Sequence, residues 1–236
     1  MGIVESTYAE LKQQELNNNP YSCLHMADID INPHQIEAFT FALSSLELGG
    51  AVLADEVGLG KTIEAGLVIK YLLCSGKGKI LLIMPSNLRK QWQVELEEKF
   101  DIDSLIVDSS NWEDYFAKVK SKQAVIIVSY HFSSKRKAEF GKIAWDFCVF
   151  DEAHRLRNVY KNGSKMANAL YELTKGIPKI LLTATPMQNT LLDIYGLVQF
   201  IDDRIFYSKQ VFSERYLREE DYNDLKASLE PVVQRT

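Results

Sequence analysis

Short, continuous apolar runs recur along the chain from residue 50 onward. They read GAVLAD, KILLIMP, SLIVD, AVIIVSY, WDFCVFD and KILLTATP. Runs that are apolar at successive positions, and not only at every second one, are typical of strands covered on both faces. We therefore predict that these runs form the buried strands of a mainly parallel sheet.

Helix-like segments lie between most of these runs. In NLRKQWQVELEEKF, an apolar stripe joins Leu88, Trp92 and Leu96, while Glu95 and Lys99 pair on the outer side. Trp92 is on the stripe, which predicts a position in the core. The alternation of strands and helices predicts an α/β fold with helices on both faces of the sheet. In such sheets ligands bind beyond the carboxyl ends of the strands.

The two ends of the chain depart from this rhythm. Residues 1–20 are polar and helix-prone, and we interpret them as an N-terminal extension to a lobe over residues 21–200. Near the end of that lobe, Thr190 and Asp193 predict a capping box for a further helix. We expect a helical appendage over residues 201–236.

Composition narrows the class of protein. Hydrophobic residues make up 46% and charged residues 25%, as in ordinary globular domains. The net charge is −5, whereas dedicated nucleic-acid-binding domains carry a positive excess, so any nucleic-acid contact is expected to be local. No apolar run reaches the roughly 18 residues of a membrane span, and we expect no membrane partner. Three cysteines without metal-ligand spacing indicate a reducing compartment and predict a cytoplasmic protein.

The segment ADEVGLGKTIEAG follows an apolar run and leads into a helical pattern. This is the context of a phosphate-binding loop, although Asp55 stands where G-x-x-x-x-G-K-[ST] has its first glycine. Gly58 and Gly60 allow successive N–H groups to converge on one anion at the positive end of the helix. Lys61 is predicted to reach the phosphates and Thr62 to bind Mg²⁺. The alternative is a glycine turn before an ordinary helix.

A pair of carboxylates follows a later buried run, in FCVFDEAHRL. A carboxylate at a strand tip beside a phosphate loop holds Mg²⁺, and this role suits Asp151. Glu152 is placed to polarise the attacking water. Asp–Glu pairs also cap helices, so DEAH alone is a weak signal. Its order after a phosphate loop and an apolar strand predicts nucleotide hydrolysis.

The series DEVGLGKT, DEAH and LLTATPMQN resembles the N-terminal RecA-like lobe of the SWI/SNF-type ATPases, a branch of the superfamily-two helicases. The resemblance covers roughly residues 30–236 and is closest to bacterial members, such as the ATPase that recycles RNA polymerase. It implies a three-layer αβα RecA-like P-loop domain that binds ATP and Mg²⁺. It also implies that the nucleotide is bound by loop positions Asp55, Glu56, Val57, Gly58, Leu59, Gly60, Lys61 and Thr62, since the family tolerates Asp at the first position.

The resemblance assigns further roles. INPHQIEAF looks like the family's glutamine motif, in which Gln35 would read the adenine edge. Contacts with nucleic-acid backbone are implied for Ser86 and Asn87 in MPSNLRKQW, and Ser86 is also expected to cap the next helix.

IIVSYHF resembles a neighbouring backbone-contact motif. It implies contacts from Ser129 and Tyr130, although a buried tyrosine is an equal interpretation of Tyr130. In LTATPMQN, coupling of ATP state to nucleic-acid grip is implied for Thr183, Thr185 and Gln188, with His154 as the link to the ATP site.

In this family a second RecA-like lobe supplies arginine fingers. No second phosphate-loop series follows residue 200, so we expect that lobe to lie outside this chain and the chain alone to hydrolyse ATP very slowly. We expect the full protein to move along double-stranded DNA, with RNA the less expected partner, and to work in the cytoplasm, including at the nucleoid. Two alternatives stay open: a P-loop kinase or GTPase-like switch, and a degenerate lobe that only docks a partner.

Overall fold

The computed structural model describes residues 32–54, 60–121 and 124–235. Within these ranges one parallel sheet has the strand order β3-β4-β2-β5-β6-β1-β7. The strands are β1 (Gly50–Leu53), β2 (Lys79–Met84), β3 (Ser104–Ile106), β4 (Ala124–Ser129), β5 (Phe147–Phe150), β6 (Lys179–Leu182) and β7 (Val233–Gln234). Each of the six apolar runs forms one of β1 to β6, so the predicted α/β fold with a parallel sheet is confirmed.

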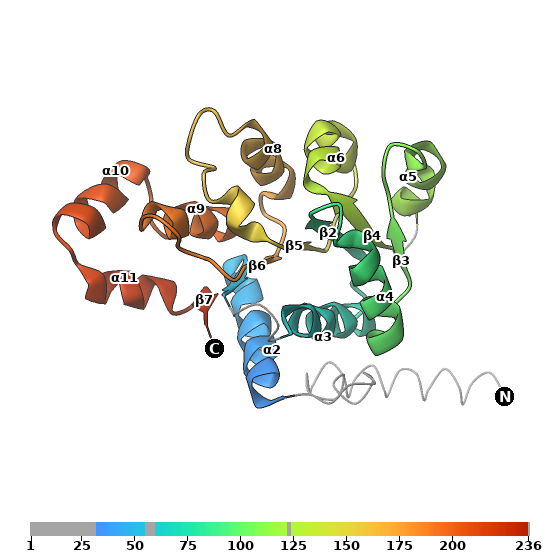
Figure 1. Cartoon of the computed structure of the whole chain (residues 1–236), viewed down its shortest axis with the longest axis horizontal. Helices are drawn as coiled ribbons and strands as arrows, with labels where there is room; N and C mark the ends of the chain where they lie inside the picture. The colour runs from blue at the N-terminus through green and yellow to red at the C-terminus, as the bar shows by residue number, and fades with distance from the viewer. Residues whose placement is uncertain (1–31, 55–59, 122–123, 236) are drawn as a thin grey trace.

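Helices cover both faces of the sheet, which gives three layers (Figure 1). One face carries α2 (Pro33–Ser45) with the short turn η2 (Leu46–Leu48), α3 (Lys61–Cys74) and α4 (Arg89–Phe100). The other face carries α5 (Trp112–Ser121), α6 (Tyr130–Lys135), α7 (Lys137–Phe140), η3 (Ala153–Leu156), α8 (Lys165–Thr174) and α9 (Leu192–Ile201).

The strands supply both halves of the core because successive side chains point to opposite faces. In β2, Leu81 and Ile83 pack with the α8–α9 side, while Ile80, Leu82 and Met84 pack with the α3–α4 side. All five are 0% exposed. Burial on both faces explains why the runs are apolar without alternation.

The C-terminal segment continues beyond the sheet as α10 (Lys209–Phe212), the π-helical turn η4 (Ser213–Arg218) and α11 (Tyr222–Leu229), which lie at the left of Figure 1. An aromatic cluster of Phe206, Phe212 and Tyr216 ties it to the core. The chain then returns to the sheet, where Val233 and Gln234 pair in parallel with β1. The sequence pattern predicts helices here and misses this last strand.

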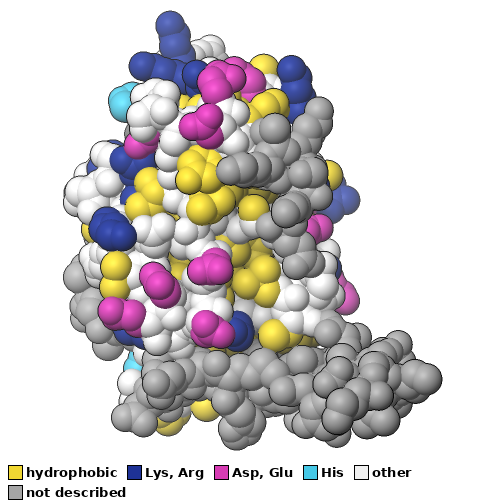
Figure 2. Space-filling view, turned by 90° about the vertical axis from the view of Figure 1, so that its right-hand side faces the viewer, with side chains coloured by type: hydrophobic (Ala, Val, Ile, Leu, Met, Phe, Trp, Pro, Cys, Tyr) yellow, Lys and Arg dark blue, Asp and Glu magenta, His cyan; other side chains and the backbone are white. Residues whose placement is uncertain are grey.

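Charged side chains of both signs are intermixed on the face that Figure 2 shows, at the β3 end of the sheet. Among the helices of the described ranges, none is long and apolar enough to cross a membrane.

Candidate nucleotide site and nucleic-acid interface

The predicted site segments meet at one edge of the sheet. Because the strands are parallel, the residues that follow β1, β2, β4, β5 and β6 share its carboxyl edge. These residues are the phosphate loop, the Ser86 turn, the Ser129 turn, DEAH and the TATPMQN segment, in that order. Gln35 joins them from the first turn of α2.

Gly60 ends the phosphate loop and begins α3. The five loop positions before Gly60 lie outside the described residues: Asp55, Glu56, Val57, Gly58 and Leu59. Gly60 has a φ of 95°, and a Cβ there would come within 2.4 Å of Gln35 Nε2, so both the backbone and the close approach favour glycine. Lys61 and Thr62 are half-buried in the first turn of α3, where the helix presents its positive end to the loop.

Gln35 is buried against the end of the phosphate loop. Its side chain is 5% exposed, and its Oε1 accepts a hydrogen bond from the backbone N–H of Asn32 at 3.0 Å. Its amide nitrogen faces Gly60. The structure therefore places Gln35 beside the loop, with its carbonyl oxygen used to cap α2 and its amide nitrogen toward the nucleotide side. Its contact with adenine stays a prediction.

Asp151 follows β5, and both of its carboxylate oxygens are held. Trp92 Nε1 donates to Oδ2 at 2.8 Å, and the backbone N–H of Glu152 donates to Oδ1 at 2.8 Å. Burial raises the pKa of the Asp151 carboxyl, while these two hydrogen bonds and the nearby charge of Lys61 oppose the rise. Because the charge of Lys61 acts on the Asp151 carboxyl, the phosphate-loop lysine and the DEAH carboxylate belong to one site.

Two aromatic residues fix Asp151 from opposite faces of the sheet. Trp92, on α4, is 2% exposed and is both a core residue, as predicted, and the donor to the carboxylate. Tyr130, on α6, is 4% exposed, and its hydroxyl donates to the backbone carbonyl of Asp151 at 2.8 Å. Burial raises the pKa of the Tyr130 hydroxyl, which keeps it a donor. Of the two interpretations of Tyr130, its burial favours the structural one.

Glu152 has a backbone conformation that non-glycine residues rarely adopt. Its φ is 54° and its ψ is 47°, in the left-handed region. Such conformations cost about 1–3 kcal/mol and cluster at functional sites. The half-exposed carboxylate of Glu152 lies with Oε2 3.1 Å from His154 Nδ1. His154 therefore contacts the predicted catalytic carboxylate, and within the described residues it makes no hydrogen bond or ion pair with Thr183, Thr185 or Gln188.

Thr183 connects the end of β6 to the strand that enters the phosphate loop. It is 0% exposed, and its N–H donates to the carbonyl of Leu53 at 3.1 Å. Its hydroxyl accepts a hydrogen bond from the N–H of Thr185 at 3.2 Å. Thr185 itself is exposed. A shift of the phosphate loop would thus reach the TATPMQN segment through two short contacts.

Arg157 is a site residue that the sequence interpretation missed. Its Nη1 donates to Gln188 Oε1 at 2.6 Å, which joins the DEAH segment to the predicted coupling segment. Gly196 allows α9 to lie on the same turn, because a Cβ at that position would come within 1.9 Å of the Arg157 carbonyl oxygen. Arg157 lies three positions after DEAH, and nothing around it in the sequence marks its partner.

The predicted capping box of Thr190 and Asp193 is wrong. Helix α9 begins at Leu192, and Asp193 Oδ2 accepts hydrogen bonds from the N–H groups of Gln188 and Asn189 at 3.0 and 2.9 Å. Burial acts to raise the pKa of Asp193, but these hydrogen bonds and the charge of Arg157 leave it below its ordinary value. Asp193 therefore fixes the Gln188 turn, and the N-cap of α9 is Leu191, with no side-chain cap hydrogen bond.

The residues predicted to contact nucleic acid lie in two neighbouring turns. Ser86 and Asn87 are exposed after β2. Ser86 does not cap α4, which begins at Arg89, and its carbonyl instead accepts from Arg89 Nε at 3.2 Å. Ser129 caps α6, with its hydroxyl accepting from the N–H of Phe132 at 3.2 Å. The exposed positions remain open to a ligand at this edge.

Comparison with known proteins gives one consistent result. The profile of the SNF2-related domain matches residues 34–236. A Bacillus subtilis (strain 168) protein, "Uncharacterized ATP-dependent helicase YqhH", is 35% identical over 209 residues, which are 85% of this chain and 34% of that protein. The RNA polymerase-associated protein RapA of Serratia proteamaculans (strain 568) is 31% identical over 210 residues, which are 85% of this chain and 21% of RapA.

Among solved structures, the Sulfolobus solfataricus SWI2/SNF2 ATPase core in complex with dsDNA is similar with a TM-score of 0.74. The sequences are 23% identical, and the match covers 89% of this chain and 45% of that one. This likeness concerns the fold. The chain spans about a third or less of the length of the curated relatives it matches.

Proposed function

The chain belongs to the family of SNF2-related domains, as its motifs predicted, and from this premise we propose that it is the ATP-binding lobe of a nucleic-acid-dependent ATPase. In the whole protein this lobe would work with a second RecA-like lobe, hydrolyse ATP and move along double-stranded DNA in the cytoplasm. The names of the relatives support the ATP dependence, and the duplex bound to the Sulfolobus core supports DNA.

One observation carries the proposal: Lys61 begins α3 after β1, and Asp151 follows β5 at the same carboxyl edge of the sheet, where the charge of Lys61 acts on its carboxyl. The two residues are 90 positions apart in sequence, and the fold brings them together at the start of α3. A positive helix end, a lysine and a held carboxylate form the arrangement that binds a nucleoside triphosphate with its metal. A chance GKT sequence in a helix would not require this arrangement.

The donor set fits Mg²⁺. Thr62 offers a hydroxyl and Asp151 a carboxylate whose two oxygens each accept one hydrogen bond and keep a further lone pair. Mg²⁺ prefers such oxygen ligands together with waters and substrate phosphates. When bound, the metal would neutralise charge that develops on the phosphates. Trp92 holds the Asp151 carboxylate in its orientation and excludes water from one side.

Glu152 is the residue that we assign to the attacking water. Its carboxylate is half-exposed beside Asp151, and its backbone conformation turns it out of the strand direction. His154 Nδ1, 3.1 Å away, is positioned to orient this carboxylate. Lys61 would bind the β- and γ-phosphates, and the arginine fingers would come from the second lobe.

Coupling to DNA would run through the contacts between DEAH and the TATPMQN segment. Arg157 and Gln188 join the two segments, and Thr183 joins the second of them to β1. Ser86, Asn87 and Ser129 lie at the same edge, where N–H groups and hydroxyls suit phosphate oxygens. A change in the phosphate loop would thereby alter the grip on the duplex.

The test is calorimetry of ATP with Mg²⁺ on the full chain, with and without duplex DNA. Lys61→Ala removes a charge-assisted contact with the phosphates and is expected to weaken ATP binding at least about tenfold. Lys165→Ala is the matched control, because Lys165 is also the first residue of a helix but is exposed on α8. Equal affinity of the parent and Lys61→Ala would contradict the proposal.

A GTP titration separates the remaining alternatives. A GTPase-like switch would prefer GTP, and a docking module would bind neither nucleotide while remaining folded. The proposed lobe is expected to prefer ATP and, without its second lobe, to hydrolyse it about 10³-fold or more below the rate of a complete motor. Rapid DNA-stimulated turnover by the chain alone would contradict the assignment to a half-site.

A further inference from the structure

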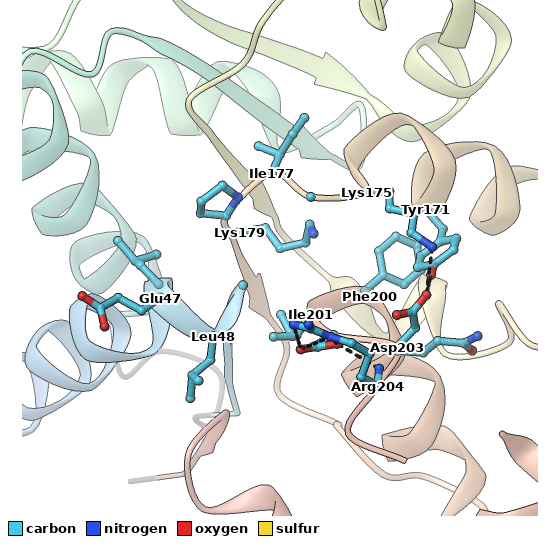
Figure 3. A pocket seen from close by; sticks show the side chains of 16 residues that line it. Glu47, Leu48, Tyr171, Lys175, Ile177, Lys179, Phe200, Ile201, Asp203 and Arg204 are labelled. Carbon is cyan, nitrogen blue, oxygen red and sulfur yellow. Dashed lines mark hydrogen bonds and ion pairs between the residues drawn. The ribbon is translucent and has the colours of Figure 1, made fainter. Parts of the chain in front are cut away.

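A cavity of about 510 Å³ lies at the opposite edge of the sheet from the nucleotide site. Its walls come from η2, the start of β6, the ends of α8 and α9, and the residues that follow α9 (Figure 3). Because β1 and β6 begin here, this is the amino edge of the sheet. Neither the described end of the phosphate loop, Gly60 to Thr62, nor DEAH lines it.

Lys179, the first residue of β6, projects into this cavity (Figure 3). Its side chain lies on the face of β6 that packs against α8 and α9, where Leu181 is 0% exposed, and it is itself only 2% exposed. Its backbone N–H donates to the carbonyl of Gly49 at 3.1 Å, and the pairing with β1 and β5 fixes the strand. The fold therefore positions a lysine where an apolar residue is expected.

The carboxylates of the cavity are occupied by other partners. Asp203 accepts from the Tyr171 hydroxyl at 2.6 Å and from Lys175 Nζ at 2.9 Å. Asp202 accepts from Arg204 Nε at 2.9 Å and from Arg204 Nη2 at 2.7 Å. The Glu47 side chain, at the left of Figure 3, points away from the lysine.

Within the described ranges, Lys179 Nζ makes no hydrogen bond and no ion pair. Burial lowers the pKa of Lys179 to about 8, and the Cys148 thiol and Asp202 oppose this only in part. A buried ammonium without a partner is unfavourable, so its place in a cavity wall points to a group from outside.

Gln199 supplies a second unsatisfied group in the same wall. Its Oε1 is buried and accepts no hydrogen bond from any residue that the structure describes. Buried carbonyl oxygens are nearly always hydrogen-bonded, so this atom is suited to accept from a ligand donor. The cavity thus presents one cationic donor and has an unsatisfied acceptor buried in its wall, in a volume within the range of small-molecule sites, about 300–1,000 Å³.

We propose that this cavity binds a small molecule that carries an oxyanion, either phosphate or carboxylate, next to a hydroxyl or amide donor. The oxyanion lies on Lys179 and the donor lies on Gln199. Tyr171, Phe200 and Ile201 supply apolar surface for the remainder of the ligand. The site is independent of the nucleotide site, so the proposal does not rest on ATP binding.

The test is calorimetry with glycerol 3-phosphate and glycerate, which share one polyol frame and differ in the oxyanion, with glycerol as the uncharged probe. It is done in the Lys61→Ala background, which weakens capture of the phosphate probe by the phosphate loop. At least one charged probe is expected to bind, glycerol is not, and the probe that binds tells phosphate from carboxylate. Lys179→Met is expected to weaken binding about tenfold or more, and Lys165→Met, at an exposed lysine on α8, is the control.

Two further measurements keep the result decisive. Gln199→Glu places a negative charge beside the negatively charged ligand and is therefore expected to weaken binding. This variant tests the site even if Lys179→Met fails to fold. In the Lys61→Ala background, affinity is expected to fall as the pH rises through about 8, because the Lys179 ammonium loses its proton while both probes stay ionised. The charged and titratable groups around Lys179 are Cys148, Tyr171, Lys175, Asp202, Asp203 and Arg204, and Glu47 lies in the same cavity wall with its side chain pointing away.

Binding that is lost in both variants and retained in the control supports the site. Absence of binding by both charged probes, or binding that is unchanged in Lys179→Met and Gln199→Glu, would overturn it.

Discussion

At the carboxyl edge of the sheet the half-buried carboxylate of Asp151 accepts hydrogen bonds from Trp92 and from the backbone of Glu152. At the amino edge the side chain of Lys179 is only 2% exposed, and its ammonium donates no hydrogen bond to the described residues. Both edges frame the same strands. One chain can therefore build one polar site completely from its own residues and leave another to be completed by a ligand.

The largest effect is expected from Gly196→Ala, which separates α9 from the DEAH segment. The new Cβ would lie 1.9 Å from the Arg157 carbonyl oxygen, so backbone must move, at a cost of about 3 kcal/mol or more in the free energy of unfolding. Gly163→Ala is the matched control, because a Cβ there meets nothing within 4 Å. Urea denaturation measures both, and equal stabilities would show that α9 does not rest on Arg157.

Lys179→Met is expected to stabilise the ligand-free protein. A pKa lowered from 10.5 to about 8 means that the folded state disfavours the ammonium by about 3 kcal/mol below pH 8. Between about pH 8 and 10.5 the unfolded chain binds more protons, so the stability of the parent rises with pH and its deficit relative to Lys179→Met disappears. Denaturation at pH 7, 9 and 10.5 checks this, and a variant less stable than the parent at pH 7 would mean that the lysine is satisfied within the fold.

Trp92→Phe tests whether the hydrogen bond to Asp151 serves the site or only the fold. Trp145→Phe is the control, because Trp145 Nε1 donates to the Phe140 carbonyl at 3.0 Å, on the other face of the sheet. Both variants are expected to lose about 1–2 kcal/mol of stability. Only Trp92→Phe is expected to weaken the dependence of ATP binding on Mg²⁺, measured by calorimetry with and without the metal. Equal Mg²⁺ dependence in the two variants would assign Trp92 to the core alone.

The smallest effect is expected from Arg157→Lys, which keeps the charge but shortens the reach to Gln188. Duplex DNA changes the affinity for ATP by some factor, and this factor is expected to be about fivefold smaller in the variant. That loss corresponds to about 1 kcal/mol of coupling free energy. Arg155→Lys, at the exposed neighbour, is the control. The same calorimetric titrations measure it, and an unchanged factor would remove Arg157 from the coupling path.

Periodicity and motif order predicted most of the fold, because buried strands and phosphate-loop segments have local signatures. Strand β7 has none: it is two residues long and exists because Val52 and Leu53 offer an edge to Val233 and Gln234. The capping box failed for a related reason. The carboxylate of Asp193 accepts hydrogen bonds from two N–H groups of the Gln188 turn, which the local sequence pattern does not predict.

The site residues divide in the same way. Lys61, Asp151 and Gln188 belong to motifs, and their positions in the chain predicted that they would meet. Trp92 and Arg157 act through partners 59 and 31 positions away, and nothing near them in sequence marks those partners. Lys179 resembles the polar flank of an apolar strand, and only the packing of α8 and α9 over it shows that it is buried.

The hydrogen bond from Trp92 to Asp151 also gives the carboxyl edge an optical property. Indole emission depends on the charges beside the ring, and here a carboxylate oxygen lies 2.8 Å from Nε1. The other two tryptophans, Trp112 and Trp145, lie on the opposite face of the sheet. A chain with Phe at those two positions would keep Trp92 as its single tryptophan. The emission wavelength of Trp92 would then report ligand binding at the Asp151 carboxylate.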